Sequence, residues 1–206
     1  STLNPSFCAA SVLHGRLHKF PRRTASAALL FILLKLTEKR HDIKLVALHI
    51  DNGAGEARRW AEEIATSAGV LLQIKKRNPE HTIEEDISAS ASAAGITAVA
   101  CGKTLDDEAE AIFRAFVSGD IRSLGSGSEP EEICWIYPLE TIPTTEARLY
   151  ATLHFDGFFV EKEEKEKKGG DIRGIIRAYT SRHPSTLYAM YHIGRRIRSC
   201  IPDTKQ

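Results

Sequence analysis

The sequence predicts an α/β protein in which five mostly parallel strands form a three-layer α/β/α sandwich, with further helices at the C-terminal end. Short apolar runs of strand length alternate with helical segments, so that a new βα unit begins roughly every 25 residues. The clearest strand, Ile43–Ile50, is apolar almost throughout, as strands buried on both faces of a parallel sheet are. With 206 residues, of which 42% are hydrophobic and 27% charged, the chain can bury one sizeable core.

The individual elements follow from local patterns. Strands are expected at the apolar runs 6–13, 43–50, 69–74, 96–101 and 133–137. Helices are expected at 25–36, with Thr24 as N-cap, at 57–68 and 83–94, and from 106 over the apolar positions up to 116. Three more are expected, one capped by Thr144 or Thr145 and running to 153, and two at 172–181 and 185–198. We expect an α/β domain over residues 1–153, a charged surface loop over 154–170, and C-terminal helices over 171–206 that pack on the same domain. The loop contains the run 161–168 (EKEEKEKK), whose alternating signs indicate a solvated segment.

Charge and cysteine content exclude several classes of protein. The formal net charge of +1 gives no global field for nucleic acid or membrane, so any basic patch must be local. Cys8, Cys101, Cys134 and Cys200 are scattered without a CxxC pair, which favours neither a disulfide framework nor a cysteine-rich metal site, and indicates a reducing compartment. The longest apolar run, 27–34, is too short to span a bilayer, and no signal peptide precedes the domain, so we expect a cytoplasmic protein with no membrane partner.

The strongest chemical pattern lies between Ile96 and Asp120. A short strand ends at Gly102, and Asp106, Asp107 and Glu108 then open a helix. The carboxyl end of a parallel strand is where open α/β sheets bind ligands. Two interpretations stay open: the carboxylates hold Mg²⁺ against the phosphates of a nucleotide, or they stabilise the helix through its dipole. The first interpretation needs a phosphate cradle elsewhere in the chain.

A basic loop is the candidate for that cradle. Residues 14–23 (HGRLHKFPRR) lead into the first predicted helix, where backbone N–H groups and the helix dipole attract phosphate. The cationic side chains of this loop are Arg16, Lys19, Arg22 and Arg23. The alternative is an ordinary solvated loop. A second local basic patch consists of Arg195, Arg196 and Arg198 in the last helix.

Four segments, in the same order along the chain, resemble one protein superfamily. Gly102–Ala109 (GKTLDDEA), followed by Gly119–Asp120, resembles the GHNLDDEA…GD segment of the PP-loop ATP pyrophosphatases, in the branch that 2-thiolates tRNA uridines. The other segments similar to this branch are His49–Gly53 (HIDNG), Tyr137–Pro143 (YPLETIP) with Glu146 and Tyr150–Ala151, and His183–Thr186 (HPST). The resemblance covers residues 27–197 and implies the Rossmann-like fold of the adenine nucleotide alpha-hydrolases. It implies vestigial nucleotide-binding positions at Ser26, His49, Asp51, Gly102, Asp106 and Asp107, with ATP and Mg²⁺ as cofactors if the site still binds.

The sequence departs from this family where the family carries its chemistry. The SGGxDS loop is replaced by residues 14–26 (HGRLHKFPRRTAS), and no register, whether anchored on Ser11 or on Ser26, restores the glycines that wrap a pyrophosphate. The thiolases' CxxC pair and their later cysteine are also missing. We therefore expect no catalytic residue and no metal site, and the chain most resembles the catalytically degenerate second subunit of the cytosolic tRNA wobble-uridine thiolase.

The leading hypothesis is a non-catalytic subunit that supports 2-thiolation of the tRNA wobble uridine. It would bind a catalytic thiolase subunit as a heterodimer and contact the tRNA backbone through the two basic patches. One alternative is an active, adenylating tRNA-thiolation enzyme with a divergent PP-loop, in which Asp106 and Asp107 hold Mg²⁺. The other is a module that binds AMP or ATP without turnover.

Overall fold

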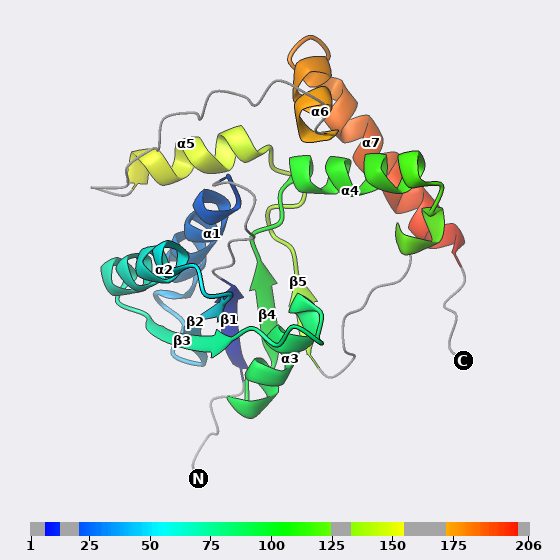
Figure 1. The fold of residues 1–206 in the computed structure, drawn as a ribbon. Coiled ribbons are helices and arrows are strands. Elements are labelled where there is room, and N and C mark those ends of the chain that lie inside the picture. The colour runs from blue at the N-terminus through cyan, green and yellow to red at the C-terminus, as the bar shows by residue number, and fades with distance from the viewer. Residues whose placement is uncertain (1–6, 13–20, 125–132, 155–171, 202–206) are drawn as a thin grey trace.

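The computed structural model describes residues 7–12, 21–124, 133–154 and 172–201 (Figure 1). Five strands form one sheet of order β3-β2-β1-β4-β5, and every neighbouring pair is parallel. The strands are β1 (Phe7–Val12), β2 (Ile43–Asp51), β3 (Leu71–Lys76), β4 (Ala98–Cys101) and β5 (Cys134–Ile136). The mixed α/β class predicted from the sequence is confirmed.

Helices connect successive strands and cover the sheet. They are α1 (Pro21–Thr37), α2 (Gly55–Ala68), α3 (Ile83–Ala93), α4 (Leu105–Ser118), α5 (Thr144–His154), α6 (Ile172–Thr180) and α7 (Ser185–Cys200), with a short 3₁₀ helix η1 at Ile121–Leu124. The predicted charge run at 161–168 lies outside the described residues. Within the described ranges, no helix combines the length and apolarity that crossing a membrane requires.

The alternation of side chains along β2 shows how the layers are built. Leu48 packs against Ile87 of α3 on one face of the sheet. Ala47, its neighbour in sequence, packs with Leu30 of α1 and Ala61 of α2 on the other face. Successive side chains of a strand point to opposite faces, so β2 is buried on both sides between α3 and the α1–α2 layer. Figure 1 shows the same arrangement.

The first helix begins earlier than the sequence pattern predicts. Helix α1 starts at Pro21 rather than after an N-cap at Thr24, so Arg22 and Arg23 belong to its first turn. Proline is favoured at the first helical position, because its fixed φ suits the helix and its missing N–H would have no partner there. The prediction that residues 14–23 are all loop is therefore wrong for 21–23, and residues 14–20 lie outside the described part of the chain.

The C-terminal helices pack on α4, at one side of the sandwich (Figure 1). Leu105 and Ala109 of α4 form a buried cluster with Leu187 and Tyr191 of α7 and with Ile176 of α6. This cluster contains no residue of the sheet, so the apolar packing of α6 and α7 is against α4.

Gly102, immediately after β4, allows a close approach by α1. A Cβ atom built at Gly102 would lie 2.9 Å from both the N and the Cα atoms of Ser26 in α1. Backbone atoms cannot rotate away as a side chain can, so only glycine fits this position. Through this contact, α1 packs directly against the carboxyl end of β4.

Replacing Gly102 by alanine tests that contact. Gly102→Ala is expected to lower the free energy of unfolding by about 1–3 kcal/mol, because overpacking against backbone forces the elements apart. Urea denaturation measures the change. Gly174→Ala in α6 is the control, since a Cβ there meets nothing within 4 Å and a helical alanine is favoured over glycine by about 1 kcal/mol. Equal stability of Gly102→Ala and the native chain would contradict the close approach.

Candidate functional site

The candidate site lies at the carboxyl edge of the sheet, where the strand order reverses. The chain runs outward from β1 to β2 and β3, then returns to the other side of β1 for β4 and β5. Ligands of open α/β sheets bind in the crevice outside the strand ends at such a switch point. The structure brings Ser26 and Gly102 into contact at the end of β4. His49, which is 2% exposed, and Asp51 lie among the last three residues of β2.

Asp51 shapes the turn after β2. Its Oδ1 atom accepts a hydrogen bond from the N–H of Gly53 at 2.8 Å. The Oδ1 atom of Asn52 accepts one from the N–H of Ala54 at 3.1 Å. Gly53 adopts the positive φ of 86° that this turn requires. Asp51 therefore closes the connection between β2 and α2, and Arg58 lies 3.9 Å from its other carboxylate oxygen.

Asp107 is bonded within the first turn of α4. Its Oδ2 atom accepts hydrogen bonds from the N–H of Thr104 at 3.1 Å and from the Oγ1 hydroxyl of Thr104 at 3.0 Å. Thr104 is the N-cap residue of α4 and is fully buried. A side chain at the third helical position that reaches back to the N-cap N–H satisfies a donor that the helix leaves open. Asp107 therefore fixes the start of α4.

Asp106 reaches from α4 to a different helix. Its Oδ2 atom accepts a hydrogen bond from the N–H of Thr144, the first residue of α5, at 2.7 Å. The Oγ1 atoms of Thr104 and Thr144 share a hydrogen bond of 2.8 Å, and the N–H of Leu105 donates to the carbonyl oxygen of Ile142 at 3.0 Å. A carboxylate is favoured at a helix N-terminus. Asp106 therefore joins the start of α5 to the start of α4.

Glu108 joins α4 to α7. Its carboxylate is 2% exposed and forms ion pairs with Lys103 and with Arg198, the second at 2.5 Å. The Nε–H of Arg198 also donates to the carbonyl oxygen of Leu124 at 3.1 Å. Burial, the largest single influence, opposes ionisation of Glu108, but Lys103 and Arg198 together outweigh it and hold the pKa of Glu108 below its ordinary value.

The three adjacent carboxylates thus bond to three different parts of the fold. This arrangement matches the helix-stabilising interpretation of the acidic segment. Mg²⁺ is held by carboxylate oxygens grouped around the ion, and no group of three or more His, Cys, Asp or Glu side chains among the described residues is placed to hold a metal ion. In the described residues, the carboxylates of this edge are engaged with the starts of α4 and α5 and with Lys103 and Arg198.

The predicted phosphate-binding residues are found in different situations. Arg16 and Lys19 lie outside the described residues. Arg22 and Arg23 lie in the first turn of α1. Arg195 and Arg196 of α7 are exposed and, with His192 and Ser199, line a shallow hollow on that helix. Arg198 differs from these two, because its guanidinium turns inward and donates to the buried Glu108.

Sequence reasoning missed two buried polar contacts. Asp86 of α3, 1% exposed, accepts a hydrogen bond from the N–H of Asn78 at 3.0 Å and lies 3.2 Å from Nδ1 of His81. The Tyr191 hydroxyl donates to Oε1 of Glu140 at 2.8 Å. Burial and this carboxylate raise the pKa of Tyr191, and the nearby Arg195 lowers it only in part. The first contact closes the β3–α3 connection, and the second ties α7 to the segment after β5.

The sheet order and the hydrogen bonds of the acidic turn define the class. This is a parallel α/β protein in which the first turn of α4 bonds to the elements around the carboxyl edge of the sheet. No protein-family model and no curated protein matches the sequence. Among solved structures, the U34-tRNA thiolase NcsA from Methanococcus maripaludis, determined with its [4Fe-4S] cluster, is similar with a TM-score of 0.74 and 17% identity, over 94% of this chain and 72% of that chain. A universal stress protein family member from Burkholderia pseudomallei has a TM-score of 0.36 and 16% identity, over 64% of this chain and 96% of that chain. The first comparison shows that this chain has the fold of that thiolase; the second carries no argument.

The cluster of NcsA raises the question of whether this chain has ligands for one. Iron–sulfur clusters are held by cysteine thiolates that converge on the metal. Cys101 ends β4, whereas Cys134 pairs in register with Ala98 at the opposite end of that strand, and Cys200 ends α7. The described cysteines do not gather in one place, so the described part of the chain does not fit a cluster of this kind.

Glu108→Gln tests the buried ion pairs. At neutral pH the variant is expected to lose about 1.5–3 kcal/mol of unfolding free energy, the range for hydrogen bonds to charged groups. Folding lowers the pKa of Glu108, so its stabilisation is present above the unfolded pKa of about 4.3 and is lost as the pH falls through the folded pKa. The difference between variant and native chain should therefore shrink below about pH 4.3. Chemical denaturation at several pH values measures it.

Glu62→Gln is the matched control for this experiment. Glu62 pairs with Arg58 on the surface of α2, where the carboxylate is 45% exposed, so its loss should change stability little. A difference between Glu108→Gln and the native chain that stays constant across this pH range would contradict the assignment.

Proposed function

We propose that this chain is a non-catalytic subunit that supports 2-thiolation of the wobble uridine in tRNA, together with a catalytic thiolase partner of the same fold. The observation that carries the proposal is the similarity to the U34-tRNA thiolase over 94% of the chain, at a TM-score of 0.74. It is joined by the four segments that resemble the PP-loop ATP pyrophosphatase superfamily. Two of them, His49–Gly53 and Gly102–Ala109, follow or end strands at the carboxyl edge of the sheet.

The site geometry supports the non-catalytic part of the proposal. Asp106 and Asp107, which the resemblance places at the nucleotide, accept hydrogen bonds from the starts of α5 and α4. The segment between β1 and α1 has no pair of adjacent glycines for a pyrophosphate. A chain with this site keeps the fold of a nucleotide-binding protein and lacks the glycine pair with which the loop after β1 would bind the phosphates.

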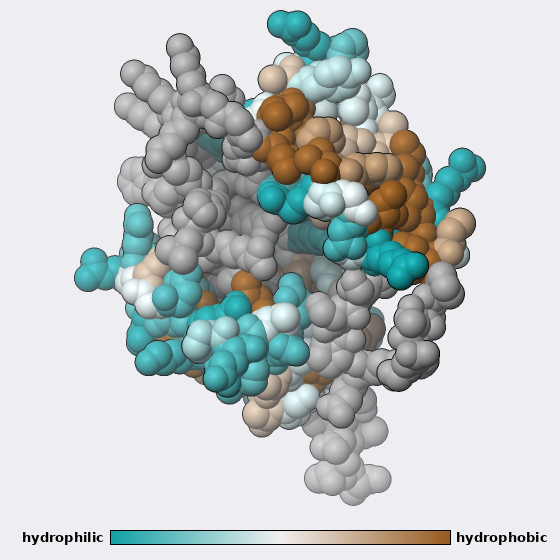
Figure 2. All heavy atoms as spheres, turned by 45° about the vertical axis from the view of Figure 1, so that its right-hand side comes forward, coloured by the Kyte–Doolittle hydropathy of each residue, from teal (hydrophilic) through white to brown (hydrophobic). Residues whose placement is uncertain are grey.

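An exposed apolar surface supports the part of the proposal that names a protein partner. Figure 2 shows apolar side chains gathered over α4 and the C-terminal helices. Phe116 and Val117 of α4 are 49% and 66% exposed, and Ile175 of α6 is 52% exposed. Contiguous apolar surface of this kind marks protein interfaces. We assign it to the catalytic subunit, and we place this heterodimer in the cytoplasm.

The decisive measurement is pyrophosphate release from ATP in the presence of tRNA. The isolated chain is expected to release no pyrophosphate above background, whereas a thiolase purified together with the chain should release it and form 2-thiouridine. Asp106→Asn with Asp107→Asn is the control pair, because these changes would abolish activity if the chain held Mg²⁺ itself. Both carboxylates also bond helix starts, so the variant is compared only where its circular dichroism is that of the native chain. Robust release by the isolated native chain, lost in the double variant, would establish the adenylating enzyme and overturn the proposal.

Purification of the native chain from its source tests the partner directly. A thiolation subunit and tRNA should both be recovered with it, and recovery of neither would contradict the proposed role. Binding of AMP or ATP by the isolated chain without turnover, measured by calorimetry with Mg²⁺, would favour the nucleotide-binding module instead.

A further inference from the structure

The positive charge of this nearly neutral chain is concentrated in its last two helices. Residues 172–201 contain six arginines and two histidines and no aspartate or glutamate. The other 176 residues then hold 22 lysines and arginines against 27 acidic residues, a formal charge of −5. A local positive surface on an otherwise acidic molecule attracts polyanions to that place.

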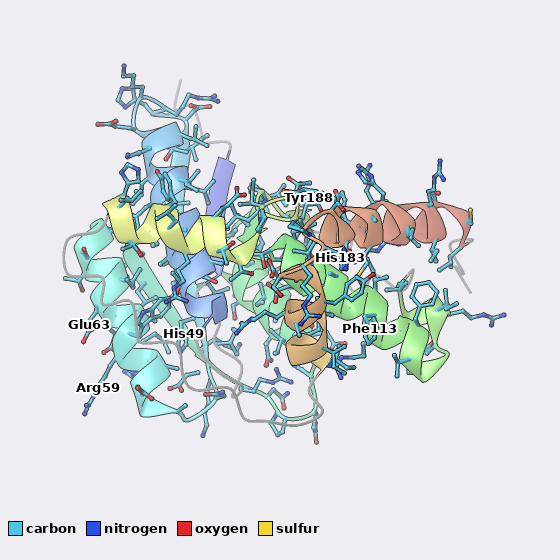
Figure 3. All side chains as sticks on the ribbon, turned by 90° about the horizontal axis from the view of Figure 1, so that it is seen from above. His49, Arg59, Glu63, Phe113, His183 and Tyr188 are labelled. Atoms are coloured by element: carbon cyan, nitrogen blue, oxygen red, sulfur yellow. The ribbon has the colours of Figure 1, made fainter. Side chains whose placement is uncertain are left out.

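The outward side of α7 combines these cations with an exposed aromatic ring. Leu187, Tyr191 and Gly194 are buried, so the remaining face of α7 is directed to solvent. That face carries Tyr188, His192, Arg195, Arg196 and Ser199, which recur at helical spacing. We call these five residues the α7 outer face. Tyr188 is 42% exposed, and Figure 3 labels it on the other side of the α4–α7 pair from Phe113.

The cations of the α7 outer face are available to a ligand. The Arg195 guanidinium carbon lies 5.9 Å from the centroid of the buried Tyr191 ring, a cation–π contact that places the guanidinium at the surface of α7. Arg196, the next residue, is exposed. Glu140 is the carboxylate that approaches this face, and it accepts the Tyr191 hydroxyl. Arg198, by contrast, is held by Glu108.

We propose that the α7 outer face binds single-stranded RNA, with an unpaired base stacked on Tyr188 and the backbone phosphates at Arg195 and Arg196. Sites for single strands combine a cationic surface with aromatic rings on which bases stack, whereas contact with a duplex backbone needs no exposed ring. An acidic polypeptide would use the cations and leave the ring unused. Where the RNA is the unpaired part of a tRNA, this inference rests on the proposed function.

Tyr188→Ala tests the stacking. Fluorescence anisotropy with a labelled oligouridine is expected to show binding about 5- to 150-fold weaker than that of the native chain, while Tyr188→Phe keeps most of the affinity. Tyr179→Ala is the matched control, because Tyr179 is 56% exposed on α6, outside the α7 outer face, and its ring packs on His183 with centroids 4.8 Å apart. That variant should bind like the native chain.

Arg196→Ala tests the phosphate contact. Each phosphate contact to a single strand contributes about 0.7 to the slope of log affinity against log salt concentration, so the slope should fall by about that amount. Arg59→Ala on α2 is the control, since Arg59 is exposed and lies far from α7 in Figure 3. The slope for this variant should be unchanged.

Three results would overturn the inference: Tyr188→Ala binding oligouridine as tightly as the native chain, a fully paired RNA duplex binding as tightly as the single strand, or polyglutamate displacing the RNA at equal charge. These outcomes are independent of the proposed function. Loss of oligouridine binding in Tyr188→Ala, with no thiolase recovered from the source, would support this inference and contradict the proposed role. Recovery of the thiolase with unchanged oligouridine binding by Tyr188→Ala would do the reverse.

Discussion

The fold on the ligand side depends on the first turn of α4. Three consecutive carboxylates there point to three different partners: Asp106 to the start of α5, Asp107 to the N-cap of its own helix, and Glu108 to Lys103 and Arg198. Unsatisfied buried carboxylates are costly, so Asp107 and Glu108, which are buried, need their partners to remain in place. The central sandwich, α5 and the C-terminal helices therefore meet at one helical turn, which adds polar contacts to the apolar packing of α5 on α1 and of α7 on α4.

The sequence predicted the general architecture because that information is local. Alternating apolar runs and helical segments are visible over windows of ten to fifteen residues or so, and the mixed α/β class followed from them. The predicted start of α1 is wrong because Thr24 is a residue type favoured at the N-cap. The helix instead begins at Pro21, and proline is favoured at the first helical position. Local patterns often misplace helix ends by a few residues.

The structural role of the acidic turn could not be predicted from such local patterns. An Asp-Asp-Glu helix start is equally suited to a metal ion or to capping, and the choice depends on partners far along the chain. Thr144 follows Asp106 by 38 positions, and Arg198 follows Glu108 by 90. The same limit applies to Arg198, which the sequence groups with Arg195 and Arg196 and the structure separates from them.

Helix α7 presents different chemistry on its two sides. Its inner side packs apolar residues on α4, while its outer side is cationic and aromatic. The exposed apolar residues of α4 and α6, among them Phe116, Val117 and Ile175, lie outside the α7 outer face. The surface of these helices thus differs in character from the carboxyl edge of the sheet, where carboxylates bond the helix starts.

The hydrogen bond from Thr144 to Asp106 couples two parts of the fold that are far apart in the sequence. The N–H that begins α5 donates to one carboxylate oxygen at the start of α4. A change that moved Asp106 would therefore be transmitted to the first turn of α5, in addition to its own helix. The position of α5 is in this way linked to the carboxyl edge of the sheet, although α5 contributes no strand to it.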